Sequence, residues 1–158
     1  MENKPLRIIW HHSASAGPGH QAKAIDAYHQ QRGFPKSSLG FYGGYHVLVE
    51  KDGTIFRYRQ DNEIGAHSYG QNVNSLGICL AGNFETEVPT KEQQEAFARQ
   101  LHQWVERYNI SIKQIQPHRH FKATACPGKR LYDAWAQEIL NDPLPEDAKD
   151  LQVHDCGQ

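Results

Sequence analysis

Short apolar runs, separated by polar and glycine-containing segments, indicate strands that alternate with helices along the chain. The runs Leu6–Trp10 and Leu76–Leu80 are rich in branched residues, which is typical of buried strands. The segments Tyr45–Glu50 and Thr54–Arg59 flank Asp52-Gly53, a turn signal that predicts a β-hairpin. We therefore expect four strands within the first 80 residues.

Three further segments carry the periodicity of helices. The first covers residues 20–32 and is followed by Gly33, a residue type that readily terminates helices. The second begins with a capping box of Thr90 and Gln93. Its large apolar residues fall on one core-facing stripe: Phe97, Leu101, Trp104 and Tyr108. The third is marked by Leu131, Trp135 and Ile139 and ends near Asn141. Between the last two helices, Ile112–Gln116 is a short strand candidate.

These elements predict a single α/β domain, in which a central mixed sheet of about five strands carries three main helices. A chain of 158 residues has the usual size of one domain and buries enough surface to fold without disulfides. Residues 142–158 contain several acids, two prolines and few large apolar groups. We therefore expect the folded domain to cover residues 1–141 and residues 142–158 to form a weakly ordered tail.

The balance of charges argues against two classes of partner. The 17 Lys and Arg and the 18 Asp and Glu give a net charge of -1, so nothing favours binding to nucleic acid or to an anionic membrane. Residues 1–5 lack the apolar core of a signal peptide, and no later run is long enough to span a bilayer. We expect a protein that is cytoplasmic as synthesised, without membrane insertion. Three cysteines are too few for a disulfide scaffold, whereas ten histidines favour metal chemistry.

Histidine and cysteine side chains occur in a pattern that fits a zinc site. His118 and Cys126 lie eight residues apart, and the pair His11-His12 ends the first apolar run. Imidazole nitrogen and thiolate sulfur are usual zinc ligands, and a catalytic zinc needs three protein ligands and one open position. The pattern predicts one zinc ion held by a histidine of the early pair, by His118 or His120, and by Cys126. A buried free cysteine beside two surface histidines is the alternative that these residues leave open.

Six short motifs occur in an order that matches a known family. They are Ile8-Ile9-Trp10-His11-His12-Ser13-Ala14; Tyr28-His29 with Gly33-Phe34; Gly44-Tyr45-His46 before Asp52-Gly53-Thr54; Gly65-Ala66-His67; Ser75-Leu76-Gly77-Ile78 with Gly82-Asn83-Phe84; and His118-Arg119 with Ala123-Thr124-Ala125-Cys126-Pro127-Gly128. Through these motifs the chain resembles the zinc-dependent N-acetylmuramoyl-L-alanine amidases, in particular small bacteriophage lysozyme-amidases and animal peptidoglycan recognition proteins. The resemblance covers about residues 7–139.

The resemblance implies a set of metal ligands and two catalytic groups. It points to His11, His118 and Cys126 as the ligands of one Zn²⁺ ion, in a cleft on one side of the sheet. It assigns the hydroxyl of Tyr45 to the developing oxyanion, which a phenol stabilises by donating a hydrogen bond. Thr124 is the second candidate for this role, although some phage members carry a lysine there. The general base stays unassigned.

The same motifs supply three candidates for binding the substrate: His67, His12 and Asn83. Relatives contact the stem peptide near His67, and the alternative for His67 is a polar loop residue without this role. For His12, the favoured alternative is a position that supports the metal site or lies on the surface.

Together these assignments predict a peptidoglycan hydrolase that uses zinc-activated water to cleave the amide between N-acetylmuramic acid and the L-alanine of the stem peptide. We expect a monomer that acts on peptidoglycan or muropeptides, as a phage or prophage endolysin that reaches the cell wall after release. Two alternatives stay open: a cytoplasmic amidase that recycles cell-wall fragments, and a peptidoglycan-binding module without catalysis. Cys126 favours an enzyme, because non-enzymatic recognition proteins typically lose this ligand.

Overall fold

The computed structural model of the protein describes residues 1–141, so the tail predicted for residues 142–158 lies outside the described residues. Within the described part there are five strands: β1 Arg7–His12, β2 Val47–Val49, β3 Ile55–Arg57, β4 Ser75–Leu80 and β5 Ile115–Pro117. They are accompanied by three α-helices and two short 3-10 helices: α1 Ala22–Gln31, α2 Lys91–Tyr108, η1 Ile112–Gln114, η2 His118–His120 and α3 Trp135–Asn141. The predicted α/β class, with five strands and three main helices, is confirmed.

The strands form one mixed sheet in the order β3-β2-β4-β1-β5. β1 runs parallel to both of its neighbours, and Ile9 lies opposite Gly77 of β4 and Gln116 of β5. β2 is parallel to β4 and antiparallel to β3, which confirms the predicted hairpin across Asp52-Gly53. Gly53 has a φ of +89°, a left-handed conformation that favours glycine in this turn. The central position of β4 explains its uninterrupted burial, because both faces of the strand are covered.

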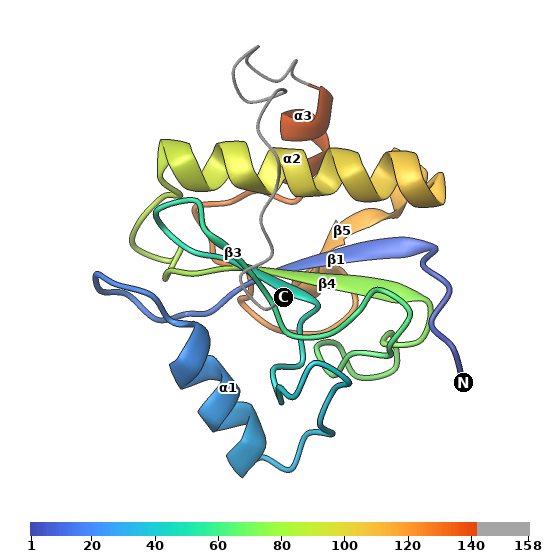
Figure 1. Ribbon diagram of the computed structural model, residues 1–158. Coiled ribbons are helices and arrows are strands. Elements are labelled where there is room, and N and C mark those ends of the chain that lie inside the picture. Colours follow the sequence, from blue (N-terminus) through green and yellow to red (C-terminus); the bar gives the residue numbers. More distant parts are fainter. Residues whose placement is uncertain (142–158) are drawn as a thin grey trace.

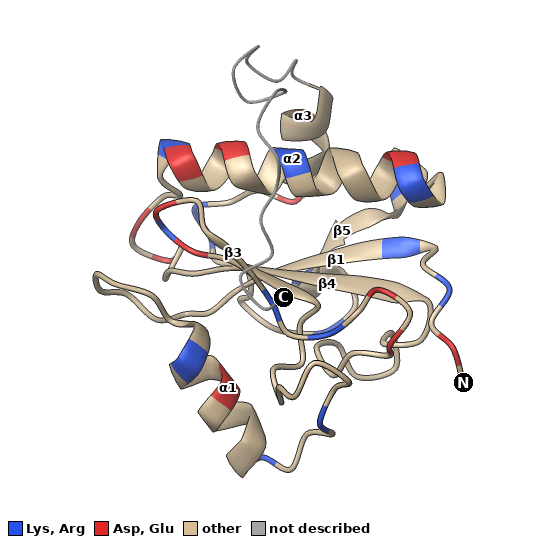
Figure 2. Cartoon of the chain, in the orientation of Figure 1, with Lys and Arg blue, Asp and Glu red and all other residues tan. Residues whose placement is uncertain are grey.

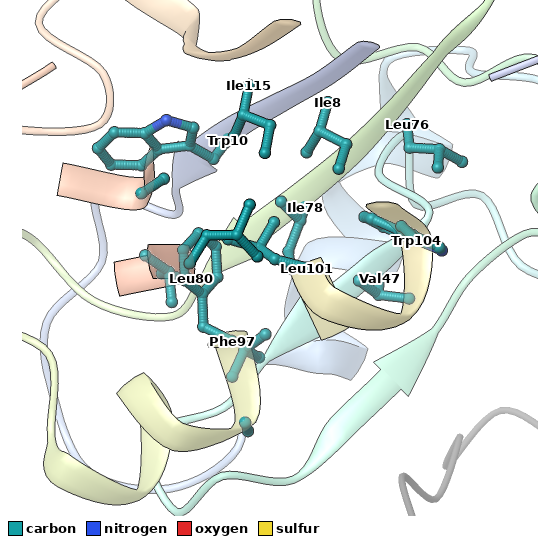
Figure 3. Packing of buried hydrophobic residues seen from close by; sticks show 14 of the residues in the cluster. Ile8, Trp10, Val47, Leu76, Ile78, Leu80, Phe97, Leu101, Trp104 and Ile115 are labelled. Carbon is teal, nitrogen blue, oxygen red and sulfur yellow. The ribbon is translucent and has the colours of Figure 1, made fainter. Parts of the chain in front are cut away.

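One face of the sheet carries most of the apolar core. Helices α2 and α3 lie over this face (Figure 1). Figure 3 shows Phe97, Leu101 and Trp104 of α2 packed against strand residues such as Ile78. These three residues are at most 1% exposed, whereas Tyr108 is only half-buried at the end of the helix. The predicted core-facing stripe of this helix is confirmed.

The predicted capping box at the start of α2 also anchors the helix to the sheet. The hydroxyl of Thr90 accepts a hydrogen bond from the backbone N–H of Gln93 at 3.0 Å, and the Gln93 side chain accepts from the Thr90 backbone N–H at 3.4 Å. The Gln93 amide then donates to the carbonyls of Val49 and Ala81, at 3.0 and 2.9 Å. One buried side chain thus fixes the helix start above the ends of β2 and β4.

The opposite face of the sheet is covered by α1 and by loops (Figure 1). The carboxylate of Glu50 accepts hydrogen bonds from the backbone N–H groups of Gln21 and Ala22, at 2.9 and 3.1 Å, and so holds the first turn of α1. The helix is buried through Ala22 and His29. The ring nitrogen Nδ1 of His29 accepts from the backbone N–H of Gly44 at 2.8 Å, which ties the helix end to the segment before β2.

Two elements differ from their predicted bounds. The strand expected at Ile112–Gln116 begins only at Ile115, because the Ser111 hydroxyl accepts from the Lys113 N–H at 3.3 Å and starts a 3-10 turn. The last helix begins at Trp135 rather than near Leu131. The preceding loop is held instead by a backbone hydrogen bond of 2.9 Å from Arg130 to Phe84.

Charged residues of both signs are spread along α2 and the loops, and β4 carries none (Figure 2). In the described part of the chain, we find no helix that combines the length and the apolar character needed to cross a bilayer.

Candidate metal centre

The sheet topology brings His11 and His118 to the same edge. His11 lies near the C-terminal end of β1, and His118 directly follows β5, the parallel neighbour of β1. Neighbouring parallel strands end on the same side of a sheet, so the residues at their ends lie close together. The centroids of the two imidazole rings are 4.5 Å apart. Alternation along β1 places Trp10 under α2 and α3 and directs His11 to the opposite face.

The loop after η2 returns Cys126 to this edge. The backbone N–H of Arg119 donates to the carbonyl of Cys126 at 3.1 Å, and its guanidinium donates to the carbonyl of Gly128 at 2.8 Å. Gly128 lies so close to Phe84 that an added Cβ would be 2.5 Å from a backbone atom of Phe84, so only glycine fits. These contacts leave the Cys126 Sγ atom 3.4 Å from the backbone N–H of His12.

Three potential metal ligands converge here. One ligand atom from each of His11, His118 and Cys126 lies within 4.8 Å of the other two, and His11 Nδ1 is 3.8 Å from Cys126 Sγ. Among the described residues, the buried Nε2 atom of His118 has no hydrogen-bond partner. A buried ring nitrogen without a partner requires an explanation, and an ion or a water supplies one. Two imidazoles and one cysteine are also a donor set that zinc accepts with a fourth position open. The three residues therefore fit a zinc ion.

The local electrostatics keep both imidazoles neutral. Burial lowers the pKa of His11 well below its usual value, and the neighbouring His67 and His118 lower it further. Burial, followed by the charge of Lys122, lowers the pKa of His118. Burial raises the pKa of the Cys126 thiol to about 11, although the His12 backbone N–H opposes this shift. Neutral imidazoles have lone pairs for a metal, whereas the thiol needs the charge of the metal to lose its proton.

The three residues line a pocket of about 360 Å³ that also contains Tyr45 and Thr124. The rings of Tyr45 and His11 have centroids 5.1 Å apart. Burial, together with the thiols of Cys79 and Cys126, raises the pKa of Tyr45, so its hydroxyl stays protonated and can donate a hydrogen bond. The Thr124 hydroxyl accepts from the backbone N–H of Cys126 at 3.3 Å, which leaves its own proton for another acceptor.

His67, predicted to bind substrate, lines the pocket beside His11 but uses both of its ring nitrogens inside the protein. Its Nδ1 atom is 3.0 Å from Nε2 of His11, and its Nε2 atom is 3.2 Å from the hydroxyl of Ser75. Its side chain is nearly buried. Room for the ring is made by Gly77, where an added Cβ would lie 2.6 Å from the imidazole.

The other two candidates for binding substrate lie in different surroundings. His12 lines the pocket, and its Nδ1 atom accepts from the backbone N–H of Phe84 at 3.1 Å. Asn83 is not among the residues that line the pocket; its side-chain oxygen accepts from the Glu85 N–H at 3.1 Å in the turn after β4. His120 is exposed, and it is His118 that joins the three-residue group.

The pocket continues into a second hollow of about 270 Å³, whose cationic residues Arg32 and Lys122 the sequence did not single out. The two hollows share five lining residues: Arg32, Phe34, Ala66, His67 and His118. Lys122 and Tyr69 line the second one, and no Asp or Glu of the described chain lines either. Arg32 and Lys122 were missed because they are exposed cations far apart in the sequence, one directly after α1 and one in the loop after η2, and only the fold brings both to one groove.

Comparison with known proteins shows to which family the chain belongs. Residues 1–129 match the family model described as N-acetylmuramoyl-L-alanine amidase. The chain belongs to this family. Peptidoglycan-recognition protein SD of Drosophila simulans is 30% identical over 147 residues, which cover 88% of this chain and 79% of that protein.

Solved structures of relatives share the fold of this amidase-family chain. The endolysin N-acetylmuramoyl-L-alanine amidase LysCS of Clostridium intestinale is 33% identical, with a TM-score of 0.70 over 81% of this chain and 78% of that one. The complex of tracheal cytotoxin with the peptidoglycan recognition proteins LCa and LCx is matched at 27% identity, with a TM-score of 0.72 over 91% of this chain and 87% of that one. The predicted family is confirmed, and it supports a peptidoglycan-related role in amide hydrolysis or in binding.

Proposed function

We propose that the protein is a zinc-dependent amidase that cleaves the bond between N-acetylmuramic acid and the L-alanine of the stem peptide. The observation that carries this proposal is the convergence of His11, His118 and Cys126 within 4.8 Å in an open pocket. A binding module needs no such group of ligands. The match to the amidase family over residues 1–129 supports the same reaction.

The chain's own residues would divide the work in a simple way. A zinc ion held by His11, His118 and Cys126 would supply a Lewis acid that activates water and polarises the scissile carbonyl. The protonated phenol of Tyr45 would donate a hydrogen bond to the carbonyl oxygen as it gains negative charge, an effect worth about 3 kcal/mol of barrier. Thr124 would add a second donor, but a neutral hydroxyl brings no charge, so Tyr45 carries more of this task.

The second hollow would hold the stem peptide. Arg32 and Lys122 give this groove positive charge, and no carboxylate of the described residues lines it to offset that charge. A ligand with free carboxylates is therefore favoured over a neutral or basic one. Solved complexes of relatives with tracheal cytotoxin, a monomeric diaminopimelic acid-type peptidoglycan, support a peptidoglycan fragment as the ligand.

The test uses purified zinc-loaded protein, defined muropeptides and mass analysis of the products. The proposed reaction releases a peptide with a free N-terminal L-alanine and leaves a free carboxyl on the lactyl group of muramic acid. The same protein stripped of metal by a chelator should release neither, and added zinc should restore the reaction. Intact muropeptide after prolonged incubation with zinc-loaded protein would overturn the proposal.

A second candidate, peptidoglycan binding without hydrolysis, is favoured by the similarity to recognition proteins. Saturable binding of a muropeptide to the zinc-loaded protein, without any cleavage, would establish it. Comparing purified cell walls with small fragments as substrates would separate an endolysin, which we favour, from a recycling amidase. An endolysin should clear polymeric wall material, whereas a recycling enzyme should act on the fragments alone.

A further inference from the structure

The ring of His67 is enclosed by hydrogen bonds that leave no nitrogen for the substrate. Its Nδ1 atom faces Nε2 of His11 at 3.0 Å, and its Nε2 atom faces the hydroxyl of Ser75 at 3.2 Å. The Ser75 hydroxyl is in turn 3.0 Å from the backbone carbonyl of Asn72. A continuous chain of hydrogen bonds therefore runs from a strand of the central sheet to one of the three potential metal ligands.

The donor and the acceptor in each of these hydrogen bonds follow from the backbone carbonyl of Asn72, at which the series ends. The Asn72 carbonyl oxygen can only accept, so the Ser75 hydroxyl donates to it and accepts from Nε2–H of His67. A neutral imidazole has a single N–H, so Nδ1 of His67 is an acceptor. Its partner is Nε2 of His11, which must then donate.

The consequence for His11 is a fixed tautomer. With its proton on Nε2, His11 has its lone pair on Nδ1, the atom that lies 3.8 Å from Cys126 Sγ. The opposite tautomer would place an N–H between the ring and the thiol and would leave no lone pair there for an ion. Ligand histidines generally have their second nitrogen held by such a partner, which sets the ring orientation and its basicity.

The backbone around His67 is arranged to hold this geometry. The Asn72 side chain accepts from the backbone N–H groups of His67 and Ser68, both at 2.9 Å, and so closes the loop that carries the ring. Gly77 of β4 leaves the space that the ring fills, since an added Cβ would lie 2.6 Å from the imidazole. Glycine inside an otherwise apolar strand is the sequence signal of such a close approach.

We infer that His67 is a positioning residue: its Nδ1 accepts a hydrogen bond from Nε2–H of His11 and thereby keeps the Nδ1 lone pair of His11 directed toward Cys126 and His118. This inference rests on the zinc site of the proposed function. It replaces a hydrogen bond between His67 and the substrate with an action through the metal ligand.

The test begins with the protein free of metal. Nitrogen chemical shifts of ¹⁵N-labelled histidines report which ring nitrogen bears the proton. We expect His11 to carry its proton on Nε2 before any metal is added. A proton found on Nδ1 of His11 would overturn the inference without any mutation.

Two variants then test separately the hydrogen-bond acceptor of His67 and the space that its ring fills. His67→Phe keeps a ring against Gly77 but removes the acceptor, and zinc affinity, measured by competition with a chelator, should fall by about 10- to 100-fold. His67→Asn places an oxygen near the position of Nδ1 and should recover most of the affinity and the Nε2 tautomer of His11. His20→Phe is the matched control, because His20 is exposed and pairs only with Asp52, and its zinc affinity should equal that of the original chain.

The possible results distinguish a failure of this inference from a failure of the proposed function. If the original chain binds zinc and His67→Phe binds it equally well, the positioning role is wrong while the amidase proposal stands. If the original chain binds zinc with the expected tautomer but cleaves no muropeptide, the amidase proposal is wrong while the positioning role stands. Should His67→Phe fail to fold, the tautomer of His11 in the original chain still decides the question.

Discussion

The two faces of the central sheet differ in the side chains that they bury, although the same strands supply both. One face buries the main apolar core, and the other buries a smaller apolar cluster together with a group of polar side chains. Under α2 and α3 the core is apolar, with Trp10 of β1 among its fully buried residues. On the other face the next residue of the same strand is His11, and His46, His67 and Ser75 are buried near it. Alternation of side chains along a strand makes this division possible within one sheet.

The difference teaches that stability and chemistry are carried by separate sets of residues. The apolar face stabilises the fold by removing nonpolar surface from water, which needs no directional contacts. On the opposite face, which carries His11, His46 and His67 and is called the polar face below, a buried ring nitrogen needs a hydrogen-bond partner or an ion. His46 illustrates this, because its Nε2–H donates to the Glu63 carbonyl at 2.7 Å and its Nδ1 accepts from the Gly77 N–H at 3.0 Å. Variants of the potential metal ligands should therefore change zinc binding and activity with little loss of stability, and variants of the main apolar core should lower stability and spare the site.

The largest effect is expected for Cys126→Ser on the polar face. A serine hydroxyl is a poor zinc ligand at neutral pH, so the variant should lose bound zinc and all detectable amidase activity together. Its unfolding midpoint without metal should stay close to that of the original chain, since Cys126 is not part of the apolar core. Metal content, muropeptide cleavage and thermal unfolding check these three points.

The matched control for that variant is Cys79→Ala, which removes the buried thiol of β4. Zinc content should remain at one ion per chain in this control. Activity retained by Cys126→Ser would exclude this thiol from the metal site, whatever the control shows.

The converse experiment is Leu101→Ala in α2. Leu101 is fully buried in the apolar core, and replacing a buried leucine by alanine typically costs about 2–5 kcal/mol of unfolding free energy. Zinc binding and turnover per folded molecule should be unchanged at low temperature, because the residue faces away from the pocket. Urea unfolding and activity at 10 °C would measure both. Glu106→Ala, on the exposed side of the same helix, should change the unfolding free energy by less than about 0.5 kcal/mol.

The apolar face could be predicted from the sequence almost completely. The stripe Phe97, Leu101 and Trp104 and the capping box at Thr90 follow from local periodicity and local hydrogen bonds, and both are confirmed. The short 3-10 turn at Ile112–Gln114 was not predicted, because apolar residues spaced this closely fit a strand as well as a turn.

The polar face was predictable only in part. The residues expected to bind metal were identified by motifs, and their convergence depends on β1 and β5 being neighbours, which the strand order decides. The link between His67 and His11 joins residues 56 positions apart and has no periodic signature. Gly77 was its one local sign, since a glycine inside an apolar strand indicates a close approach.

A smaller change at the polar face is expected for Tyr45→Phe, which removes one oxygen atom. Zinc content should be unchanged, because Tyr45 is not one of the three potential ligands. The turnover number should fall by about 100-fold, the loss expected for one hydrogen-bond donor to the developing oxyanion. Single-turnover kinetics with a muropeptide measure the chemical step directly. An unchanged rate would show that the hydroxyl takes no part in it.

The smallest difference between the two faces is expected from a change of pH, which acts on the buried histidines of the polar face. Burial lowers the pKa of His46 to about 4, against about 6.5 in the unfolded chain. As the pH falls, this histidine is therefore protonated in the unfolded state before it is protonated in the folded state. Its contribution to the free energy of unfolding is complete above pH 6.5 and declines as the pH falls toward 4. At pH 5, the protonation of His46 in the unfolded state should lower the free energy of unfolding by about 2 kcal/mol. Burial also lowers the pKa of His29 to about 4, which adds to the same trend.

Urea unfolding of the metal-free protein between pH 7.5 and pH 4.5 measures this dependence apart from any loss of metal. His46→Asn removes the titrating ring, so its stability should be lower throughout but should vary less with pH. The exposed His20 works in the opposite direction, because its hydrogen bond to Asp52 raises its pKa, and its contribution is lost as the pH rises. Stability that increased on acidification would therefore mean that surface pairs such as His20–Asp52 outweigh the buried histidines, and the polar face would not be the acid-sensitive side of the sheet.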